Sequence, residues 1–293
     1  MQRAMIIVNP SSGKEQAGEY VEQIEEVLWS NGYQVNTFET AQELDATKFC
    51  QEACLEKYDV VVSMGGDGTL NETINGMAGQ EHRPTLGIIP MGTMNDIARA
   101  LHIPFEPEAA IELLQGHRTK KIDLGKVNDH YFMNIVASGA IAQATSQVTV
   151  EQKTKLGPFA YFAEGVKAFT KRDLYDFNIQ YDDGEWVGEA WHFIAVLTNS
   201  VGGFEELSPD AEVNDGKLHC FVIKNITVAN VPLLAAALVR GELKNQKDVD
   251  YFTTSSVKIS STNDLVANVD GEIGDRMPLT LDVLPRRIEV FVP

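Results

Sequence analysis

The most informative stretch of the sequence is residues 60–76, where a predicted apolar strand (Asp59–Met64) runs into Gly65-Gly66-Asp67-Gly68. Glycine has no Cβ, so its backbone N–H groups can approach a bulky anion closely. A helix predicted to open at Thr69–Glu72 adds N–H groups and the positive end of its dipole, which favours phosphate. The carboxylate of Asp67 could hold Mg²⁺ or fix the loop. Taken alone, the pattern fits a tight strand-to-helix turn equally well.

Two further loops of the same kind follow predicted strands. Strand Ala4–Val8 precedes Asn9-Pro10-Ser11-Ser12-Gly13-Lys14, and strand Thr85–Ile89 precedes Pro90-Met91-Gly92-Thr93-Met94-Asn95-Asp96. The carboxyl ends of parallel strands meet at one edge of an α/β sheet, where such sheets bind ligands. Three small polar loops at one edge favour an anion site over three independent turns. The chain has neither a Gly-x-x-x-x-Gly-Lys-[Ser/Thr] run nor a full Gly-x-Gly-x-x-Gly.

These three loops resemble those of the diacylglycerol kinase catalytic-domain superfamily, and especially its soluble bacterial lipid kinases. The Gly-Gly-Asp-Gly core is shared with NAD kinases and phosphofructokinases, whereas Asn71-Glu72 and Asp270-Gly-Glu272 indicate lipid kinases. The likeness covers essentially the whole chain, because later segments match too. They are Ile122-Asp123-Leu-Gly-Lys-Val, Tyr131-Phe-Met-Asn134, Ser208-Pro-Asp-Ala-Glu-Val-Asn-Asp-Gly216 and Asn268-Val-Asp-Gly-Glu272.

The order of predicted elements indicates two domains. Residues 1–125 alternate strands and helices, which predicts an α/β domain: a parallel sheet with helices on both faces. Residues 126–286 are mainly strands, with helices predicted only at Gly157–Thr170 and Val228–Val239. The resemblance implies an NAD-kinase- or phosphofructokinase-like first domain, a sandwich-like β second domain that binds lipid, and a cleft between them. It also implies that the last strand, about 287–293, returns to the first domain.

The resemblance implies an enzyme that uses ATP and Mg²⁺. Asp67, Asp96 and Asp123 are then candidates for an acidic network around Mg²⁺, although Mg²⁺ usually takes only one or two carboxylates. From the residues alone, Asp96 is also explained as a first-turn acid of a helix, and Asp123 as a surface aspartate at a strand entry. The residues that the resemblance places around the nucleotide are Asn9, Pro10, Ser11, Ser12, Gly13, Thr40, Gly65, Gly66, Asp67, Gly68, Thr69, Leu70, Asn71, Glu72, Gly92, Thr93 and Asn95.

Two aspartate–glycine pairs predict turns in the second half of the chain. Asp270-Gly271 is a turn signal, and the resemblance makes Glu272 the base that accepts the proton of the acceptor alcohol, with Asp270 as the alternative. Together with Asp67 at the phosphate loop, these two carboxylates are the catalytic candidates. Asn214-Asp215-Gly216 is a second turn signal, where the resemblance implies a structural Mg²⁺ on Asp215 and a plain turn is the other interpretation.

Composition narrows the class of protein. The 293 residues carry a net charge of −18, which disfavours nucleic acid as a partner. No apolar run is long enough to span a membrane, no signal-peptide pattern is present, and the three cysteines have no Cys-x-x-Cys spacing, so we expect a cytoplasmic protein. Residues 151–172 combine basic and aromatic side chains, which suits either transient contact with an anionic membrane or an ordinary packed helix. A homodimer is compatible with the sequence.

The sequence therefore predicts phosphorylation of a lipid alcohol, with diacylglycerol to phosphatidic acid as the first hypothesis. The alternatives are another lipid acceptor (sphingosine-like or another acylglycerol), a small-molecule kinase similar to NAD kinase, and a nucleotide- or lipid-binding regulator without activity. The apolar second domain and Asp270-Gly-Glu272 count against the small-molecule kinase. Competent residues at every matched catalytic position count against the inactive regulator.

Overall fold

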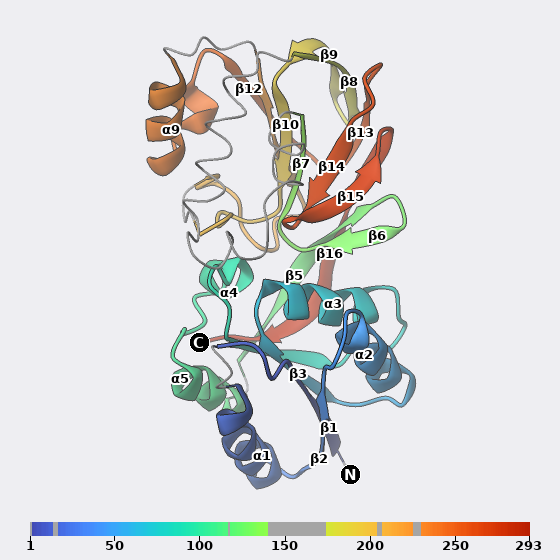
Figure 1. The fold of residues 1–293 in the computed structure, drawn as a ribbon, viewed down its shortest axis with the longest axis vertical. Coiled ribbons are helices and arrows are strands. Elements are labelled where there is room, and N and C mark those ends of the chain that lie inside the picture. The colour runs from blue at the N-terminus through green and yellow to red at the C-terminus, as the bar shows by residue number, and fades with distance from the viewer. Residues whose placement is uncertain (1, 14–16, 117, 140–173, 204–206, 225–229) are drawn as a thin grey trace. The chain divides into compact units, whose positions relative to one another are not determined.

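The chain folds into two compact units in a computed structural model that describes residues 2–13, 17–116, 118–139, 174–203, 207–224 and 230–293 (Figure 1). The first unit comprises Met1–Ile122 and Arg286–Pro293, and the second comprises Asp123–Pro285. The predicted helix Gly157–Thr170 and the basic, aromatic segment 151–172 lie outside the described residues. In the part of the chain that is described, no helix is both long and apolar enough to cross a membrane.

The first unit alternates strands and helices, as the sequence predicts. Its elements are β1 (Gln2–Val8), η1 (Ala17–Tyr20), α1 (Val21–Ser30), β2 (Tyr33–Glu39), α2 (Asp45–Leu55), β3 (Val60–Gly65), α3 (Asp67–Ala78), β4 (Thr85–Pro90), α4 (Asp96–Ala100), α5 (Pro107–Glu112), η2 (Leu113–Gln115), the start of β5 (Thr119–Val127) and the end of β16 (Leu279–Phe291).

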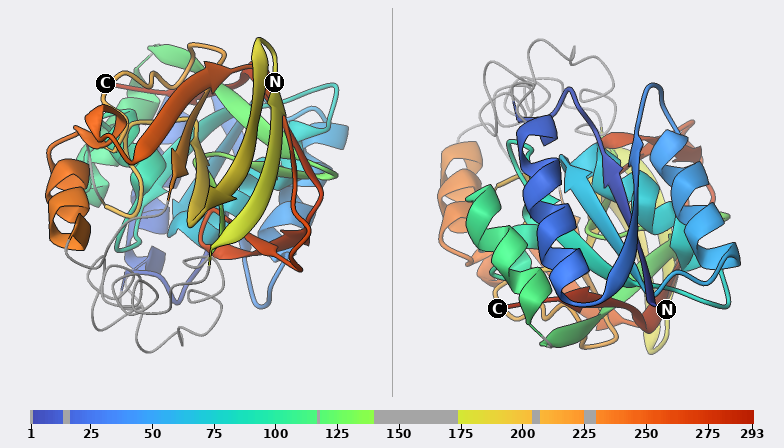
Figure 2. Two further views of the ribbon diagram at one scale, coloured as in Figure 1. Left: turned by 90° about the horizontal axis from the view of Figure 1, so that it is seen from above. Right: turned by 90° about the horizontal axis from the view of Figure 1, so that it is seen from below.

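The sheet of the first unit is parallel, with the strand order β2-β1-β3-β4-β16. Helices α1 and α5 lie on one side of it and α2 on the other, where α2 packs against α3 (Figure 2). Because both faces are covered, the central strands are continuous apolar runs rather than alternating ones. Every residue of β3 is buried, as is the Ala4–Val8 part of β1. The predicted α/β class is therefore confirmed.

The last strand completes this sheet from the far end of the chain. Val290 of β16 pairs in parallel with Leu86 of β4, and the side chains of Ile288 and Val290 are buried. The Arg287 guanidinium donates a hydrogen bond from Nε to the carbonyl of Ala78 (2.9 Å). The final residues thus belong to the core of the first unit.

The second unit is built mainly from antiparallel strands. Its elements are the end of β5, β6 (His130–Phe132), β7 (Ile135–Gly139), β8 (Tyr175–Tyr181), β9 (Gly184–Ala190), β10 (His192–Val196), β11 (Leu218–Ile223), α9 (Val231–Val239), η4 (Leu243–Asn245), β12 (Val249–Thr254), β13 (Ser256–Ser260), β14 (Val266–Val269), β15 (Glu272–Arg276) and the start of β16.

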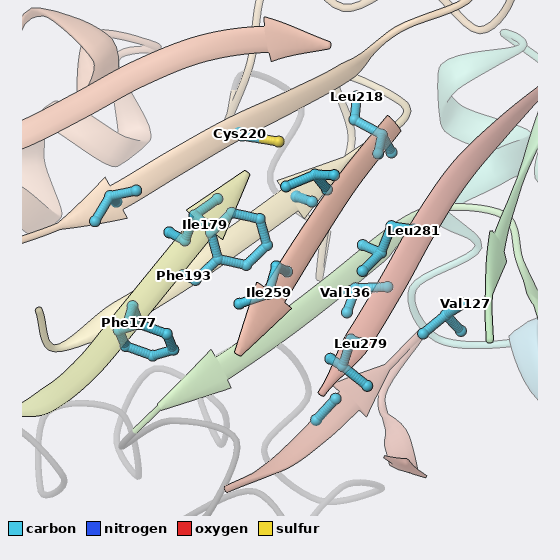
Figure 3. Close-up of a cluster of buried hydrophobic side chains, with 14 of the residues drawn as sticks. Val127, Val136, Phe177, Ile179, Phe193, Leu218, Cys220, Ile259, Leu279 and Leu281 are labelled. Carbon is cyan, nitrogen blue, oxygen red and sulfur yellow. The ribbon is translucent and has the colours of Figure 1, made fainter. Parts of the chain in front are cut away.

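Two sheets of the second unit enclose an apolar core. One contains β16-β13-β8-β9, and the other has the order β12-β11-β10-β7-β14-β15. Side chains from both meet in one cluster, including Phe177 and Ile259 from the first sheet and Phe193 and Leu218 from the second (Figure 3). This arrangement confirms the predicted sandwich-like β domain.

The outer face of the second sheet is also buried. Successive residues of β10 and β11 point to opposite sides, so Phe193 enters the sandwich core whereas Ile194 and Phe221 enter a second cluster. Leu234 of α9 and Leu243 of η4 complete that second cluster. Because both faces of β10 and β11 are buried, these two strands are continuous apolar runs in the sequence.

Several elements differ from the sequence expectations. Helix α3 begins at Asp67 rather than Thr69, and the last strand, expected at about 287–293, begins as early as Leu279 and ends at Phe291. Arg286 has a positive φ (+50°) within this strand. Strand β9 was not predicted because it is largely exposed and carries glycine and glutamate among its few apolar residues.

We predict that Val290→Ala lowers the free energy of unfolding by about 2 kcal/mol, because a fully buried side chain loses two methyl groups in a packed core. Val187 on β9 is the matched control, since it is 65% exposed whereas Val290 is 0% exposed. Val187→Ala should cost well under about 1 kcal/mol. Urea unfolding of both variants measures this, and equal losses would contradict the placement of the last strand in the core.

Candidate active site

The first loop, after β1, is tied to the loops after β3 and β4. The Asn9 side-chain carbonyl accepts hydrogen bonds from the Ser11 N–H (3.1 Å) and hydroxyl (2.7 Å). The amide Nδ2 of Asn9 donates to Thr69 Oγ1 at the start of α3 (3.1 Å). The Gly13 N–H donates to the carbonyl of Met91 (3.1 Å), with Gly13 at φ +61°. Asn9 therefore shapes its own loop and fastens it to the next.

The loops after β3 and β4 touch backbone to backbone. The Met91 N–H donates to the Gly65 carbonyl (2.8 Å). A Cβ at Gly92 would lie 2.7 Å from the Cα of Gly66, closer than real Cβ atoms come to backbone, so glycine is needed there. Asn95 (φ +52°) closes the third loop by accepting from the Gly92 N–H (3.0 Å) and donating to the Gly92 carbonyl (2.9 Å).

Asp67 joins the same two loops through its side chain. Its Oδ2 accepts the N–H of Asn95 (2.9 Å) and its Oδ1 accepts the N–H of Asp96 (3.1 Å). Burial raises the pKa of the Asp67 carboxyl above its usual value, and the charge of Asp96 adds to this, against the lowering by the two N–H donors. Asp67 and Asp96 thus form a neighbouring carboxylate pair that a cation would stabilise.

A small pocket opens where these loops meet the sheet. It is lined by Ser63, Gly65, Gly66, Asp67, Leu70, Ile88, Pro90, Asn95 and Ala98. Gly68 and Thr93, from the second and third loops, are exposed, as are Pro10 and Ser11 from the first. The first-turn N–H groups of α3 begin at Asp67, and N–H groups of a first helical turn have no acceptor within their own helix.

This donor set fits a nucleotide phosphate chain with Mg²⁺. Backbone N–H groups at a helix start and in glycine loops bind phosphate, and Mg²⁺ in phosphate sites is held by one or two carboxylates, here Asp67 and Asp96. No group of three acidic, histidine or cysteine side chains able to hold a metal ion occurs among the described residues. The fit of this site to Mg²⁺ therefore rests on the carboxylates of Asp67 and Asp96.

The Glu72 side chain is engaged by backbone donors at the start of α2. Its carboxylate accepts the N–H groups of Leu44 (3.0 Å) and Ala46 (3.2 Å) and so caps the start of α2, where Leu44 has φ +68°. Thr40, the expected nucleotide contact after β2, is held by its N–H on the Val8 carbonyl (2.8 Å). Asn71 accepts a hydrogen bond from Asn75 within α3 (2.9 Å). Glu72 thus links helix α3 to the start of helix α2.

Asp123 belongs to the second unit. It is 4% exposed within β5, so its interpretation as a surface aspartate at a strand entry is wrong. Its Oδ2 accepts the N–H of Gly216 (2.6 Å) and its own N–H donates to the Val213 carbonyl (2.8 Å). Asp123 therefore holds the 213–216 turn.

Asp215, in that turn, is engaged by donors of this chain. Its carboxylate accepts the N–H groups of Lys217 (2.9 Å) and Glu212 (3.3 Å) and lies 2.9 Å from His219 Nε2. Burial raises the pKa of the Asp215 carboxyl, but the hydrogen bonds and charge of His219 and the two N–H donors outweigh burial and hold it below its usual value. The other ring nitrogen of His219 contacts the Tyr251 hydroxyl (2.6 Å). A cation bound here would have to share Asp215 with His219.

The predicted turn at Asp270-Gly271 joins β14 to β15, with positive φ at both residues (+48° and +92°). The Asp270 carboxylate accepts three backbone N–H groups, from Met133 (2.8 Å), Asn134 (3.0 Å) and Ile135 (2.8 Å). Glu272 is the first residue of β15, and its side chain is exposed. Asp270 therefore anchors the β14–β15 hairpin, whereas the side chain of Glu272 is exposed to solvent.

The sequence did not reveal the hydrogen bonds of Asn134, whose backbone N–H is one of the three donors to Asp270. Asn134, which is buried, accepts a hydrogen bond from the Thr198 hydroxyl (2.7 Å), and Thr198 also donates to the Ser200 carbonyl (3.0 Å). The only signal was the Tyr131-Phe-Met-Asn134 match, which says nothing of a contact with Asp270. The Thr198-Asn199-Ser200 segment follows β10 and carried no motif of its own.

Comparisons with known proteins agree with this architecture. Residues 3–127 match the model of the diacylglycerol kinase catalytic domain, and residues 134–292 match that of the YegS C-terminal NAD kinase beta sandwich-like domain. A solved structure of a diacylglycerol kinase from Bacillus anthracis str. Sterne superposes with a TM-score of 0.84 at 27% identity, over 100% of this chain and 97% of that one.

Curated relatives extend over the same length. A protein named diacylglycerol kinase from Staphylococcus aureus (strain MRSA252) is 40% identical over 292 residues, which are 99% of this chain and 92% of the relative. Another with that name, from Staphylococcus saprophyticus, is 39% identical over 99% of this chain and 95% of the relative. The chain therefore belongs to the diacylglycerol kinase family and is a lipid kinase.

Proposed function

We propose that this kinase transfers the γ-phosphoryl group of ATP to the hydroxyl of diacylglycerol and releases phosphatidic acid. The observation that carries the nucleotide half of the proposal is the interlocking of three loops in the first unit. Asp67, Gly66 and Gly92 join the loops after β3 and β4, and Asn9 and Gly13 tie the first loop to them. The acceptor is inferred from the names of relatives that share 39–40% of their residues with this chain.

The chain's own part in the reaction is positioning. Phosphoryl transfer has little covalent chemistry for a protein to perform, so holding the phosphates and neutralising charge account for most of the catalysis. We assign the phosphates to the N–H groups of the Gly65–Thr69 turn and the first turn of α3, because most N–H groups of the Asn9–Gly13 and Pro90–Asp96 loops already donate within the protein. Fixed loops present these N–H groups without reorganisation when the nucleotide binds.

Asp67 and Asp96 are the proposed holders of the metal, either directly or through water. Bound Mg²⁺ would supply neutralisation of the charge that develops on the transferring phosphoryl group. Asp67 has two tasks in this proposal, because the same carboxylate accepts two backbone N–H groups of the neighbouring loop. Each carboxylate oxygen has two lone pairs, so both tasks are compatible.

Glu272 is the proposed base that takes the proton of the acceptor hydroxyl. Its exposed side chain stands at the start of a strand that Asp270 fixes through three N–H contacts. A carboxylate saturated by backbone donors is a weak proton acceptor, which favours Glu272 over Asp270 for this role. Asp270 is then a positioning residue.

The experiment that tests the function is a transfer assay with labelled ATP, Mg²⁺ and a panel of acceptors in mixed micelles. We expect diacylglycerol to be phosphorylated fastest, with sphingosine and NAD far behind. Faster phosphorylation of NAD would favour the small-molecule alternative, and turnover of sphingosine alone would reassign the lipid acceptor.

Gly92→Ala should abolish detectable ATP binding, because a Cβ would lie 2.7 Å from both Gly66 Cα and Asn95 Oδ1 and would force the two loops apart. Gly18→Ala is the matched control, since a Cβ there meets nothing within 4 Å. Isothermal titration with a non-hydrolysable ATP analogue measures the binding. Unchanged binding by Gly92→Ala would contradict the need for close loop packing.

Asp67→Asn should weaken Mg²⁺-dependent ATP binding by about tenfold or more, because the site loses a charge while one N–H acceptor remains. A Mg²⁺ titration of ATP binding measures the effect, and the urea midpoint checks that the fold is retained. Exposed Asp129 provides the control substitution Asp129→Asn. An unaltered Mg²⁺ requirement in the Asp67 variant would move the metal to other ligands.

Glu272→Gln should leave ATP affinity within about twofold of the wild type and lower turnover by about 10²–10⁴-fold, since only the proton acceptor is removed. Glu185→Gln, at another exposed glutamate at the start of a strand, should keep full turnover. Initial rates with diacylglycerol in mixed micelles measure both. Comparable turnover of the two variants would remove Glu272 from the role of base.

A further inference from the structure

Helix α9 is apolar on the side that faces away from its own unit as well as on the side that is packed. Its nine residues, Val231–Val239, include no polar side chain. Leu234 and Ala237 are buried, and Leu234 belongs to the cluster that covers the second sheet. Leu233 and Val239 are 60% and 61% exposed. A helix at the surface of a water-soluble domain normally carries polar residues on that side.

The exposed residues of α9 form one stripe. Positions 232, 233, 236 and 239 fall on one side of a helix of 3.6 residues per turn. They are occupied by Pro232, Leu233, Ala236 and Val239, and of these only Ala236 is half-buried rather than exposed. Single exposed apolar residues are ordinary, but a continuous stripe marks an interaction surface. We call these four residues the α9 stripe.

Basic residues follow the α9 stripe directly in the chain. Residues 240–248 contain Arg240, Lys244 and Lys247 against Glu242 and Asp248, in a chain whose net charge is −18. Arg240 and Lys247 are exposed, whereas Lys244 pairs with Asp210. An apolar stripe beside the exposed cations Arg240 and Lys247 matches the surface of an anionic bilayer, which offers both acyl chains and negative head groups.

We propose that the α9 stripe docks the enzyme on an anionic lipid bilayer. This inference rests on the proposed function, because an acceptor with two acyl chains resides in a bilayer and the enzyme must reach it there. Leu233 and Val239 enter the acyl boundary, and Arg240 lies among the head groups.

The test compares two double variants of the full chain. Leu233→Gln/Val239→Gln replaces the exposed aliphatic residues of the α9 stripe with residues that favour helix. Leu55→Gln/Val187→Gln is the matched control, because it changes the same two residue types where they are 74% and 65% exposed. Urea unfolding verifies that both variants fold.

The first readout is co-sedimentation with vesicles of phosphatidylcholine and phosphatidylglycerol that contain dioleoylglycerol. We expect the α9 variant to bind at least about tenfold more weakly than wild type, and the control to bind like wild type. Equal binding by all three proteins, or absent binding by wild type, overturns the proposal. Sedimentation velocity supplies the rival outcome: a wild-type dimer that the α9 variant converts to monomer would assign the stripe to a second copy of the chain.

The second readout separates this proposal from the proposed function. On vesicles the α9 variant should lose turnover in parallel with binding, while on a water-soluble short-chain diacylglycerol it should match wild type. Equal loss on both substrates would contradict a docking role and indicate damage to the acceptor or nucleotide site. If wild type phosphorylates neither form of diacylglycerol, the proposed acceptor fails, and the vesicle-binding result still decides the role of α9.

Discussion

The Asp67 carboxylate is the contact on which the candidate nucleotide site depends. One side chain accepts the N–H groups of Asn95 and Asp96 and so fixes the loop after β4 against the start of α3. The approach of Gly66 and Gly92 and the Met91–Gly65 hydrogen bond complete this contact. A carboxylate accepts but does not donate while ionised, so it can bind several N–H groups without competing donors. The spacing of the loops is therefore set by the same residue that we propose for the metal.

Aspartates organise the second unit in the same way. Asp270 gathers three N–H groups at the start of β7, and Asp123 holds the turn that contains Asp215. These side chains are largely removed from water, where an unpaired charge would be costly, and the backbone donors compensate for that cost. Glu272 differs from them, because its side chain is exposed to solvent. Asp270 and Asp123 thus fix loops of the second unit, whereas Glu272 is the residue proposed for proton transfer.

The sequence predicts the α/β class, the sandwich-like domain and the strand before each loop, because buried strands are apolar and turns need glycine or asparagine. It could not predict that Val290 pairs with Leu86, since no local pattern links residues so far apart in the chain; only the family resemblance implied that return. The Glu72 contact with Leu44 and Ala46 depends on how α2 packs on α3, which a motif within α3 does not encode. The sequence predicts Asp270 as a turn residue, but no local pattern reveals its three partners, which lie just before and at the start of β7.

The most direct measurement is the position of a Mn²⁺ ion in crystals grown with a non-hydrolysable ATP analogue, located by its anomalous scattering. The account predicts a peak beside the carboxylates of Asp67 and Asp96, with the phosphates on the N–H groups of Gly66 and Gly68 at the start of α3. A bound nucleotide whose phosphates and metal lie away from these three loops would contradict it.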